Sequence, residues 1–141
     1  MAAGPSIADM MANLGCFYGL VNSLANEETP PESVIPFAVA RENFYATARY
    51  GLDANIVWLD GQSIGLREVI PGAAKGLARL GVNEDLASRY LETIEPRTHS
   101  GRTGAQWQRQ FAATTDRDWA LLIREYAARQ KTGAPVHTWE I

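Results

Sequence analysis

Two arginines and a tyrosine recur at four-residue steps in the first half of the chain: Arg41, Tyr45 and Arg49. If this segment is helical, the three side chains share one stripe of the helix surface. Guanidinium groups are planar and always charged, so they suit the oxygens of phosphates and carboxylates. The stripe fits either a solvated basic face, which is the commoner case, or an anion-binding site.

A second segment with the chemistry of an anion site is H-S-G-R-T-G over residues 99–104, which leads directly into a predicted helix. Free amides at a helix start, close approach at Gly101 and Gly104, and the guanidinium of Arg102 are what a phosphate or carboxylate needs. Glycine before a helix is also common as a plain turn. On physical grounds both interpretations stay open.

Other combinations of reactive residues are missing from the sequence. It has two histidines, His99 and His137, and its single cysteine, Cys16, is remote from both. Neither a zinc cluster nor a Cys-His pair is therefore supported. The sequence also lacks a phosphate-loop lysine motif and a dinucleotide glycine fingerprint. We predict no catalytic residue and no metal ligand in this chain.

A first helix is predicted over residues 7–25. Ser6 and Asp9 form a capping-box pattern ahead of a wide apolar stripe with helical spacing. The stripe consists of Ile7, Met10, Met11, Leu14, Phe17, Tyr18, Val21 and Leu24. Interleaved glycines and alanines suit a helix held closely by its neighbours, and a stripe of this kind is usually core.

Prolines and glycines divide the rest of the chain. The acidic, proline-rich link over 26–33 cannot continue a helix, and a second helix is predicted from Pro36 to Tyr50 with Gly51 at its C-terminal end. A short hairpin is predicted at about 55–66, around the turn Asp60-Gly61. Later helices are predicted from Val69 to Gly81, from the cap Asn83 to Pro96, from about Thr103, and from the cap Asp116 to Gly133, with an extended tail over 134–141.

Length and composition favour a single domain over residues 1–141. The fold class is mainly α, with about six helices and one short β-hairpin. The net charge is -3 and no basic run is present, which argues against nucleic acid as a partner. Asp9, Asn13 and Asn22 interrupt the apolar N-terminal stretch, so neither a membrane span nor a signal peptide is predicted. One cysteine fits a reducing compartment, and we expect the cytoplasm.

The segment A-R-E-N-F-Y-A-T-A-R-Y-G-L-D-A, over residues 40–54, resembles the central signature of bacterial carboxylate-amine ligases of the glutamate-cysteine ligase type, within the glutamine synthetase-like superfamily. The segment G-R-T-G-A-Q-W-Q-R over 101–109 is similar to a late element of that family, and P-V-H-T-W over 135–139 resembles the ending of one branch. The opening over 4–13 is similar to the helix that precedes these motifs. The resemblance therefore covers nearly the whole chain, with its elements in the family's order.

This resemblance implies an ATP-dependent ligation, in which the γ-carboxylate of glutamate is phosphorylated and an amine such as that of cysteine attacks, as in glutathione biosynthesis. In such families, metal-binding carboxylates lie on a curved antiparallel sheet of the N-terminal part. The chain is then expected to be the C-terminal helical subdomain of a larger α+β ligase and to be inactive without that sheet. ATP and Mg²⁺ would serve the complete enzyme, and no cofactor is expected for this chain alone.

The resemblance also selects five residues as candidates for facing substrate or phosphate: Asn43, Arg49, Tyr50, Arg102 and Gly104. Each has a structural alternative, since Arg49 would also complement the helix dipole and Asn43 could bridge backbone groups. Many family members have Trp-Arg where this chain has Phe44-Tyr45, so acceptor specificity cannot be carried over. The expected partner is the N-terminal catalytic part of the enzyme. The alternative function is a stand-alone helical interaction or dimerisation module, with a second copy of the chain as a partner.

Overall fold

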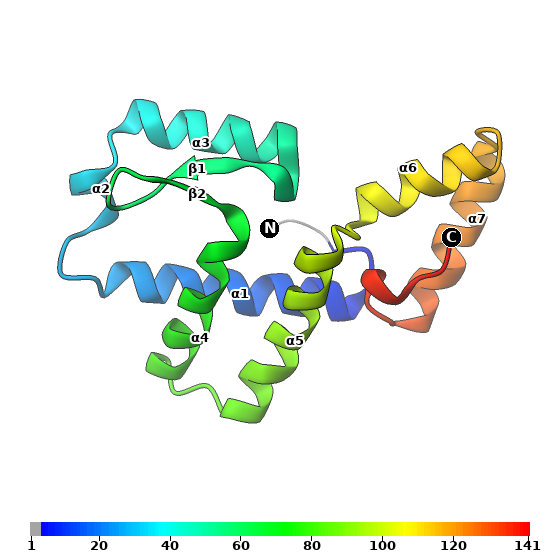
Figure 1. The fold of residues 1–141 in the computed structure, drawn as a ribbon. Coiled ribbons are helices and arrows are strands. Elements are labelled where there is room, and N and C mark those ends of the chain that lie inside the picture. The colour runs from blue at the N-terminus through cyan, green and yellow to red at the C-terminus, as the bar shows by residue number, and fades with distance from the viewer. Residues whose placement is uncertain (1–3) are drawn as a thin grey trace. The chain divides into compact units, whose positions relative to one another are not determined.

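The computed structural model describes residues 4–141, apart from the side chain of Leu66. This part of the chain is mainly α-helical with one two-stranded hairpin, as predicted (Figure 1). Its helices are α1 (Ile7–Ala25), α2 (Pro31–Val34), α3 (Phe37–Tyr50), α4 (Ile70–Arg79), α5 (Glu84–Ser100), α6 (Gly104–Thr114) and α7 (Trp119–Thr132), its strands are β1 (Asn55–Val57) and β2 (Ser63–Gly65), and 3-10 turns occupy Gly51–Asp53, Leu66–Val69 and Val136–Thr138. None of the helices described is long and apolar enough to cross a membrane.

Residues 4–141 contain seven α-helices, one more than predicted, because the single turn α2 forms within the acidic link. Pro31 occupies the first position of this turn, where its missing N–H costs no hydrogen bond. The Ser33 hydroxyl donates to the Pro30 carbonyl at 2.7 Å, and the Ile35 amide donates to the Pro31 carbonyl at 2.8 Å. Helix α1 still ends before these prolines, as predicted.

Local capping signals place several helix starts correctly. The Asp9 amide donates to the Ser6 hydroxyl oxygen at 3.2 Å, and the Ser6 hydroxyl donates to the Asp9 carboxylate at 2.9 Å. The Thr103 hydroxyl oxygen accepts the Gln106 amide at the start of α6. Asn83 caps α5 in the same way through its side-chain oxygen. These bonds satisfy amides that the first helical turn leaves without partners.

Helix α5 does not end at Pro96, as predicted, but runs through it to Ser100. A proline inside a helix removes the hydrogen bond to the carbonyl four residues earlier, here that of Glu92, so α5 continues with one bond fewer. The Ser100 hydroxyl donates to the Pro96 carbonyl at 2.7 Å, and the Thr98 hydroxyl donates to the Glu95 carbonyl at 2.9 Å. The helix stops at Gly101, whose φ of 68° is left-handed.

The last helix is capped by Asp118, so the prediction of Asp116 as the cap is wrong. Asp116 and Arg117 have left-handed backbones, with φ of 48° and 62°, whereas a cap requires an extended one. The Arg117 amide donates back to the Ala112 carbonyl at 2.8 Å and closes the end of α6. The Asp118 carboxylate accepts the Leu121 amide at 2.9 Å and opens α7.

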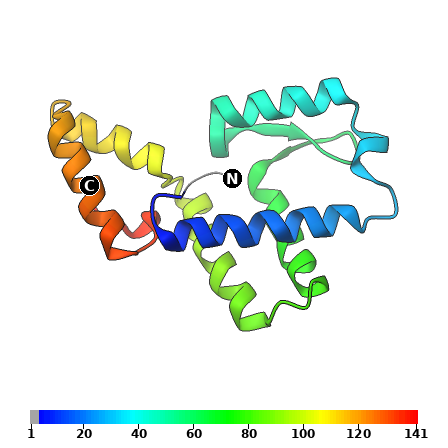
Figure 2. The ribbon, with the colours of Figure 1, turned by 180° about the vertical axis from the view of Figure 1, so that it is seen from behind.

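The chain divides into two compact units, which we call the hairpin unit (residues 16–87) and the terminal unit (residues 4–15 with 88–141). The single domain over 1–141 stays a prediction, and its first three residues lie outside the described part. In the hairpin unit, α3 lies along β1 (Figures 1 and 2). The two strands are antiparallel, with Ile56 opposite Ile64, and the predicted turn Asp60-Gly61 joins them.

Helices α1 and α4 approach closely in the hairpin unit, because two glycines meet where they cross. A Cβ atom on Gly76 would lie 1.7 Å from the Gly19 carbonyl oxygen, and one on Gly19 would lie 2.3 Å from the Ala73 carbonyl oxygen. Neither position has room for a side chain. At Gly72, one turn earlier on α4, the nearest neighbour of a Cβ would be the Leu20 side chain at 3.4 Å.

We expect Gly76→Ala to lower the free energy of unfolding by about 2 kcal/mol or more, because the backbone of α1 must shift to admit the methyl group. Gly72→Ala is the matched control on the same helix. It is expected to be neutral or to stabilise by up to about 1 kcal/mol, since alanine favours helices over glycine. Urea unfolding followed by circular dichroism measures both. Equal stability of the two variants would contradict this helix crossing.

The core of the terminal unit is mainly aromatic and consists of Trp107, Phe111, Val136 and Trp139. Trp107 stacks on Phe111 with ring centroids 4.8 Å apart and meets Trp139 edge to face at 5.7 Å. The indole of Trp107 donates to the Glu140 carbonyl, and that of Trp139 donates to the Ala134 carbonyl, both at 2.9 Å. The tail predicted to be extended over 134–141 therefore packs on this core and includes a 3-10 turn.

The wide apolar stripe of α1 is exposed, whereas the sequence predicts it in the core. Its large side chains have exposed fractions between 38% and 68%: Ile7, Met10, Met11, Phe17, Tyr18 and Val21. The buried side of the helix carries Asp9 and the small residues Ala12, Gly15, Gly19 and Ser23. Close packing at Gly19 requires small residues on that side, so the large ones face outward. Periodicity correctly identified the helix and its two faces, but not which face is buried.

Candidate functional site

Asn43, a predicted substrate contact, uses both ends of its amide on the backbone of β1. Its Nδ2 donates to the Val57 carbonyl at 2.8 Å, and its Oδ1 accepts the Val57 amide at 2.9 Å. Val57 pairs with Ser63 of β2, so the Asn43 amide takes the place of a third strand at the outer edge of β1. The geometry is thus that of the structural alternative, and a role toward substrate stays a prediction.

Asn43→Ala is expected to destabilise the hairpin unit by about 1–3 kcal/mol, because it leaves the amide and the carbonyl of Val57 without their partner. Asn43→Asp keeps the acceptor and loses the donor, so an intermediate loss is expected. Hydrogen exchange at the Val57 amide gives the direct measurement. Unchanged protection of that amide in Asn43→Ala would contradict the clamp.

Arg49 lies in the last turn of α3, where its guanidinium is exposed. Its Cζ is 5.6 Å from the ring centroid of Tyr50, a neighbour that is itself 57% exposed. Within residues 4–141 no hydrogen bond or ion pair engages this guanidinium. Arg49 therefore lies where a positive charge complements the helix dipole. Its N–H donors also remain available to an anion.

Arg102 lies in the terminal unit, in the turn between α5 and α6. Its guanidinium is exposed and donates to the His137 carbonyl at 3.4 Å. The turn already satisfies several of its own amides: that of Arg102 donates to the Ser100 hydroxyl, and that of Thr103 donates to the Gly101 carbonyl. Fewer backbone amides are thus free to bind an anion than the sequence predicts. The guanidinium of Arg102 is the part of this segment that remains available.

Gly104, the first residue of α6, is a position of close packing. A Cβ atom there would lie 2.6 Å from Cγ of Pro5 and 3.4 Å from the Tyr126 hydroxyl. The glycine thus makes room for the chain just before α1. This contact is enough to require a glycine at position 104, whether or not a ligand binds there. The approach of Gly104 to substrate stays a prediction.

The most buried charged group of the terminal unit was missed by sequence reasoning. The carboxylate of Asp9 is fully buried, and its Oδ1 accepts from Arg97 at 3.0 Å. Its Oδ2 accepts the Val136 amide at 2.9 Å and also the Ser6 hydroxyl. Arg97 donates in addition to Asn13. One carboxylate therefore joins the start of α1, the end of α5 and the C-terminal tail.

His137 lies beside this buried ion pair, and its Nδ1 is buried without a hydrogen-bond partner among the residues described. Burial lowers the pKa of His137 below its ordinary value of 6.5, the nearby Asp9 opposes this shift, and Arg97 and Arg102 add to it. The imidazole is therefore neutral at neutral pH.

The lowered pKa of His137 makes stability depend on pH. The unfolded chain protonates His137 near pH 6.5, whereas the folded chain does so only at a lower pH. The contribution of His137 to the free energy of unfolding is therefore complete above about pH 6.5 and decreases as the pH falls toward the folded pKa. We expect His137→Gln to flatten the decrease in melting temperature across this acidic window. An unchanged pH dependence in this variant would contradict the assignment.

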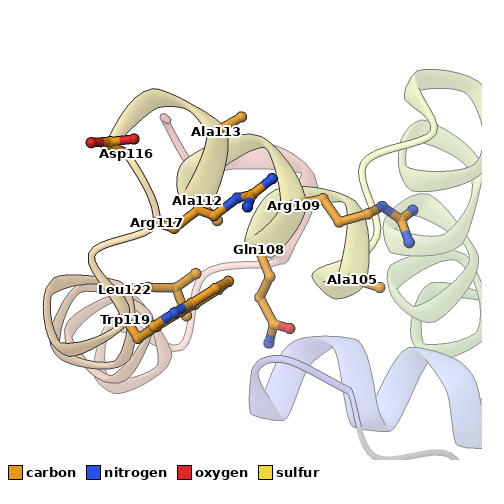
Figure 3. A pocket seen from close by; sticks show the side chains of 9 residues that line it. All are labelled: Ala105, Gln108, Arg109, Ala112, Ala113, Asp116, Arg117, Trp119 and Leu122. Atoms are coloured by element: carbon orange, nitrogen blue, oxygen red, sulfur yellow. The ribbon is translucent and has the colours of Figure 1, made fainter.

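A groove of about 860 Å³ lies between α6 and α7 of the terminal unit. Its lining combines Arg117 and the exposed indole of Trp119 with Gln108 and Arg109 of α6. Figure 3 shows Arg117 and Trp119 projecting toward α6, with Asp116 pointing away. The sequence pattern gave no signal for this groove, because it depends on the left-handed turn at Asp116.

Residues 1–133 match the sequence model of glutamate-cysteine ligase family 2 (GCS2), so the match spans nearly the whole chain and includes the motifs that bear Arg49 and Arg102. The chain belongs to this family. No curated protein and no solved structure matches it. Membership in glutamate-cysteine ligase family 2 confirms the resemblance to carboxylate-amine ligases and indicates ligase chemistry of the glutamate-cysteine type.

The described residues of this GCS2 member do not fit a metal ion. Within residues 4–141, no group of three or more His, Cys, Asp and Glu side chains is placed to hold one. Mg²⁺ prefers several oxygen ligands in near-octahedral geometry, so we assign no mechanistic step through a metal to this part of the chain. The exposed guanidiniums of Arg49 and Arg102 do fit the oxygens of a nucleotide phosphate or a carboxylate.

Proposed function

We propose that this chain is the C-terminal helical part of an ATP-dependent ligase that joins the γ-carboxylate of glutamate to an amine such as that of cysteine. A carboxylate oxygen attacks the γ-phosphorus of ATP, and ADP leaves. The amine nitrogen then attacks the acyl carbon, loses a proton, and displaces phosphate. The family match over residues 1–133 is the observation that carries this proposal.

In this proposal the helical part supplies cations, and the sheet-bearing N-terminal part supplies the metal and nucleotide sites. Negative charge accumulates on the phosphoryl and carboxylate oxygens during both steps, so a fixed positive charge stabilises the transition states more than the bound substrates. Arg49 supports this role because its guanidinium is exposed without a hydrogen bond or ion pair in the described part of the chain. Arg102 supports it because only a long bond to the His137 carbonyl holds its guanidinium.

The proposal is tested by ADP release in the presence of glutamate and cysteine, in a cytoplasm-like reducing buffer. The isolated chain is expected to release none, and the chain combined with the sheet-bearing part is expected to turn over only when both substrates are present. Absence of turnover in the combined protein would overturn the proposal. Equal turnover by the isolated chain would overturn the assignment of the metal and nucleotide sites to the sheet-bearing N-terminal part.

A second function, a stand-alone helical interaction or dimerisation module, is favoured by one observation, the exposed apolar stripe of α1. This function requires a tight homodimer or a complex with another protein, and no turnover in either. Light scattering on the purified chain tests it, because a stable monomer that binds no protein would count against it.

A further inference from the structure

The groove between α6 and α7 presents two side chains that make no polar contact within the terminal unit. The guanidinium of Arg117 is exposed and takes part in no hydrogen bond or ion pair among residues 4–141. The indole of Trp119 is 60% exposed, and its N–H donates to no group in the same part of the chain. Both side chains project toward α6 (Figure 3). A charged group and a flat apolar ring therefore face the same groove.

The groove has room for a segment of polypeptide. Its volume of about 860 Å³ lies near the upper end of the range for pockets that enclose a drug-sized molecule. Helix α6 contributes three alanines to the lining, Ala105, Ala112 and Ala113, and their small side chains leave the space open. Leu122 of α7 adds apolar surface. The groove therefore suits a segment that offers an apolar ring to the indole and a carboxylate to the guanidinium.

A segment of this composition exists in the chain itself. The acidic link over 26–33 contains the only adjacent pair of prolines in the sequence, Pro30 and Pro31. Pro30 is exposed, and its φ of -60° and ψ of 140° are those of polyproline II. Segments in this conformation bind grooves lined by aromatic side chains, because their shape is fixed before binding and little conformational entropy is lost. The ring of Pro30 therefore suits the indole of Trp119.

The link also supplies a carboxylate for Arg117. Glu27 forms an ion pair with Lys75 at 3.2 Å. Glu28 and Glu32 are exposed, and neither is in an ion pair among the residues described. Glu28 lines a hollow of its own unit together with Lys75, whereas Glu32 does not. Glu32 is thus the carboxylate of the link that is most available to a cation from outside the hairpin unit.

The two units differ in net charge in the sense that favours this contact. The hairpin unit, which contains the link, has nine acidic and five basic residues. The terminal unit, which contains the groove, has seven acidic and eight basic ones. Surfaces of opposite charge attract each other during association, so the link of one molecule is drawn toward the groove of another.

We infer that the groove between α6 and α7 binds the acidic link of a second copy of this chain. In this contact the ring of Pro30 packs on Trp119, and the carboxylate of Glu32 accepts from the guanidinium of Arg117. Reciprocal binding of two links to two grooves closes the assembly as a dimer.

Charge reversal in the full chain tests the inference, with Arg117→Glu in the groove and Glu32→Arg in the link. Both side chains are exposed, so each variant is expected to keep the circular dichroism and melting temperature of the unaltered chain. Sedimentation is expected to show a salt-sensitive dimer for the unaltered chain. Each variant should raise the dissociation constant of the dimer at least about tenfold, because like charges then face each other. The matched control is Arg124→Glu, an exposed position of α7 outside the groove, which should dimerise like the unaltered chain.

A mixture of the two reversed variants identifies the occupant as a second copy. In an equimolar mixture the reversed link of one molecule meets the reversed groove of the other, and the remaining link and groove are both unaltered. The dissociation constant is therefore expected to return to within about threefold of that of the unaltered chain. Rescue by mixing requires two molecules, so it is specific to a contact between copies.

Unchanged dimerisation of both variants would overturn the inference, and so would a mixture that associates as weakly as its components. A chain that stays monomeric at about 100 μM would also overturn it, even if a peptide of residues 26–34 bound the groove, because the occupant would then be an acidic segment of another protein. These measurements involve no turnover. Their outcome is therefore independent of the proposed ligase function.

Discussion

In the complete ligase, Arg49→Ala is expected to lower kcat by about 10²- to 10³-fold, the usual loss when one donor to a developing negative charge is removed. The guanidinium of Arg49 is exposed and its neighbour Tyr50 contacts it through the ring, so its removal breaks no hydrogen bond of the fold described here. Stability should therefore change by less than about 0.5 kcal/mol. Steady-state kinetics of ADP release with glutamate and cysteine give the measurement.

Arg41→Ala is the matched control for Arg49, because it removes an equally cationic, exposed side chain two turns earlier on α3. We expect its kcat to stay within about threefold of the unaltered enzyme, as usual for a charge that does not touch the reacting atoms. Arg49→Lys should fall between, since lysine keeps the charge and loses the planar pair of donors. Equal losses from Arg41→Ala and Arg49→Ala would indicate a general basic face.

The largest effect on stability is expected from Asp9→Ala, at about 3–5 kcal/mol. The substitution leaves Arg97 partly buried without its counter-ion and leaves the Val136 amide and the Ser6 hydroxyl without an acceptor. Because this carboxylate joins the start of α1 to the tail, the terminal unit should lose cooperativity as well. Urea unfolding, with Trp107 and Trp139 as buried fluorescent reporters, follows this unit.

The control for Asp9 is Glu27→Ala, which removes the carboxylate of an exposed ion pair with Lys75 at 3.2 Å. Solvent and salt screen such pairs, so we expect a loss below about 1 kcal/mol. If Asp9→Ala cost no more than Glu27→Ala, the buried pair with Arg97 would not contribute to the fold as the structure indicates.

Local signals in the sequence predicted most of the secondary structure. Ser6 and Asn83 were identified as caps and Thr103 as the approximate start of a helix, and each accepts an amide of the helix that follows. These predictions are reliable because both partners lie within three residues of each other. The hairpin was also identified from a local turn, Asp60-Gly61.

Two features that were not predicted lie at the ends of helices, and two others depend on residues far apart in the chain. Pro96 lies inside α5 although the helix loses one hydrogen bond there, and Asp116 is left-handed in the turn where the Arg117 amide donates to the Ala112 carbonyl. The partner of Asp9 is Arg97, 88 residues away. The burial of the small-residue face of α1 depends likewise on Gly76, a neighbour from another helix.

For the candidate site, spacing alone left Arg49 and Arg102 undecided between solvated cations and anion-binding groups. The resemblance to carboxylate-amine ligases selected them, and their role toward substrate stays a prediction. Asn43 and Gly104 came from the same motifs, yet one clamps Val57 and the other packs on Pro5. One motif can therefore contain residues with a structural contact beside residues with exposed, unengaged donors, and the geometry is what distinguishes them.

The most direct test of the proposed ligase uses hydroxylamine in place of cysteine. An acyl phosphate formed from glutamate and ATP reacts with hydroxylamine to give a γ-glutamyl hydroxamate, which reports the first step alone. We expect the complete ligase to form this product, and Arg49→Ala and Arg102→Ala each to lower its rate at least about tenfold while the fold is kept. Hydroxamate formation at the unaltered rate in both variants, or none in the complete ligase, would contradict the account.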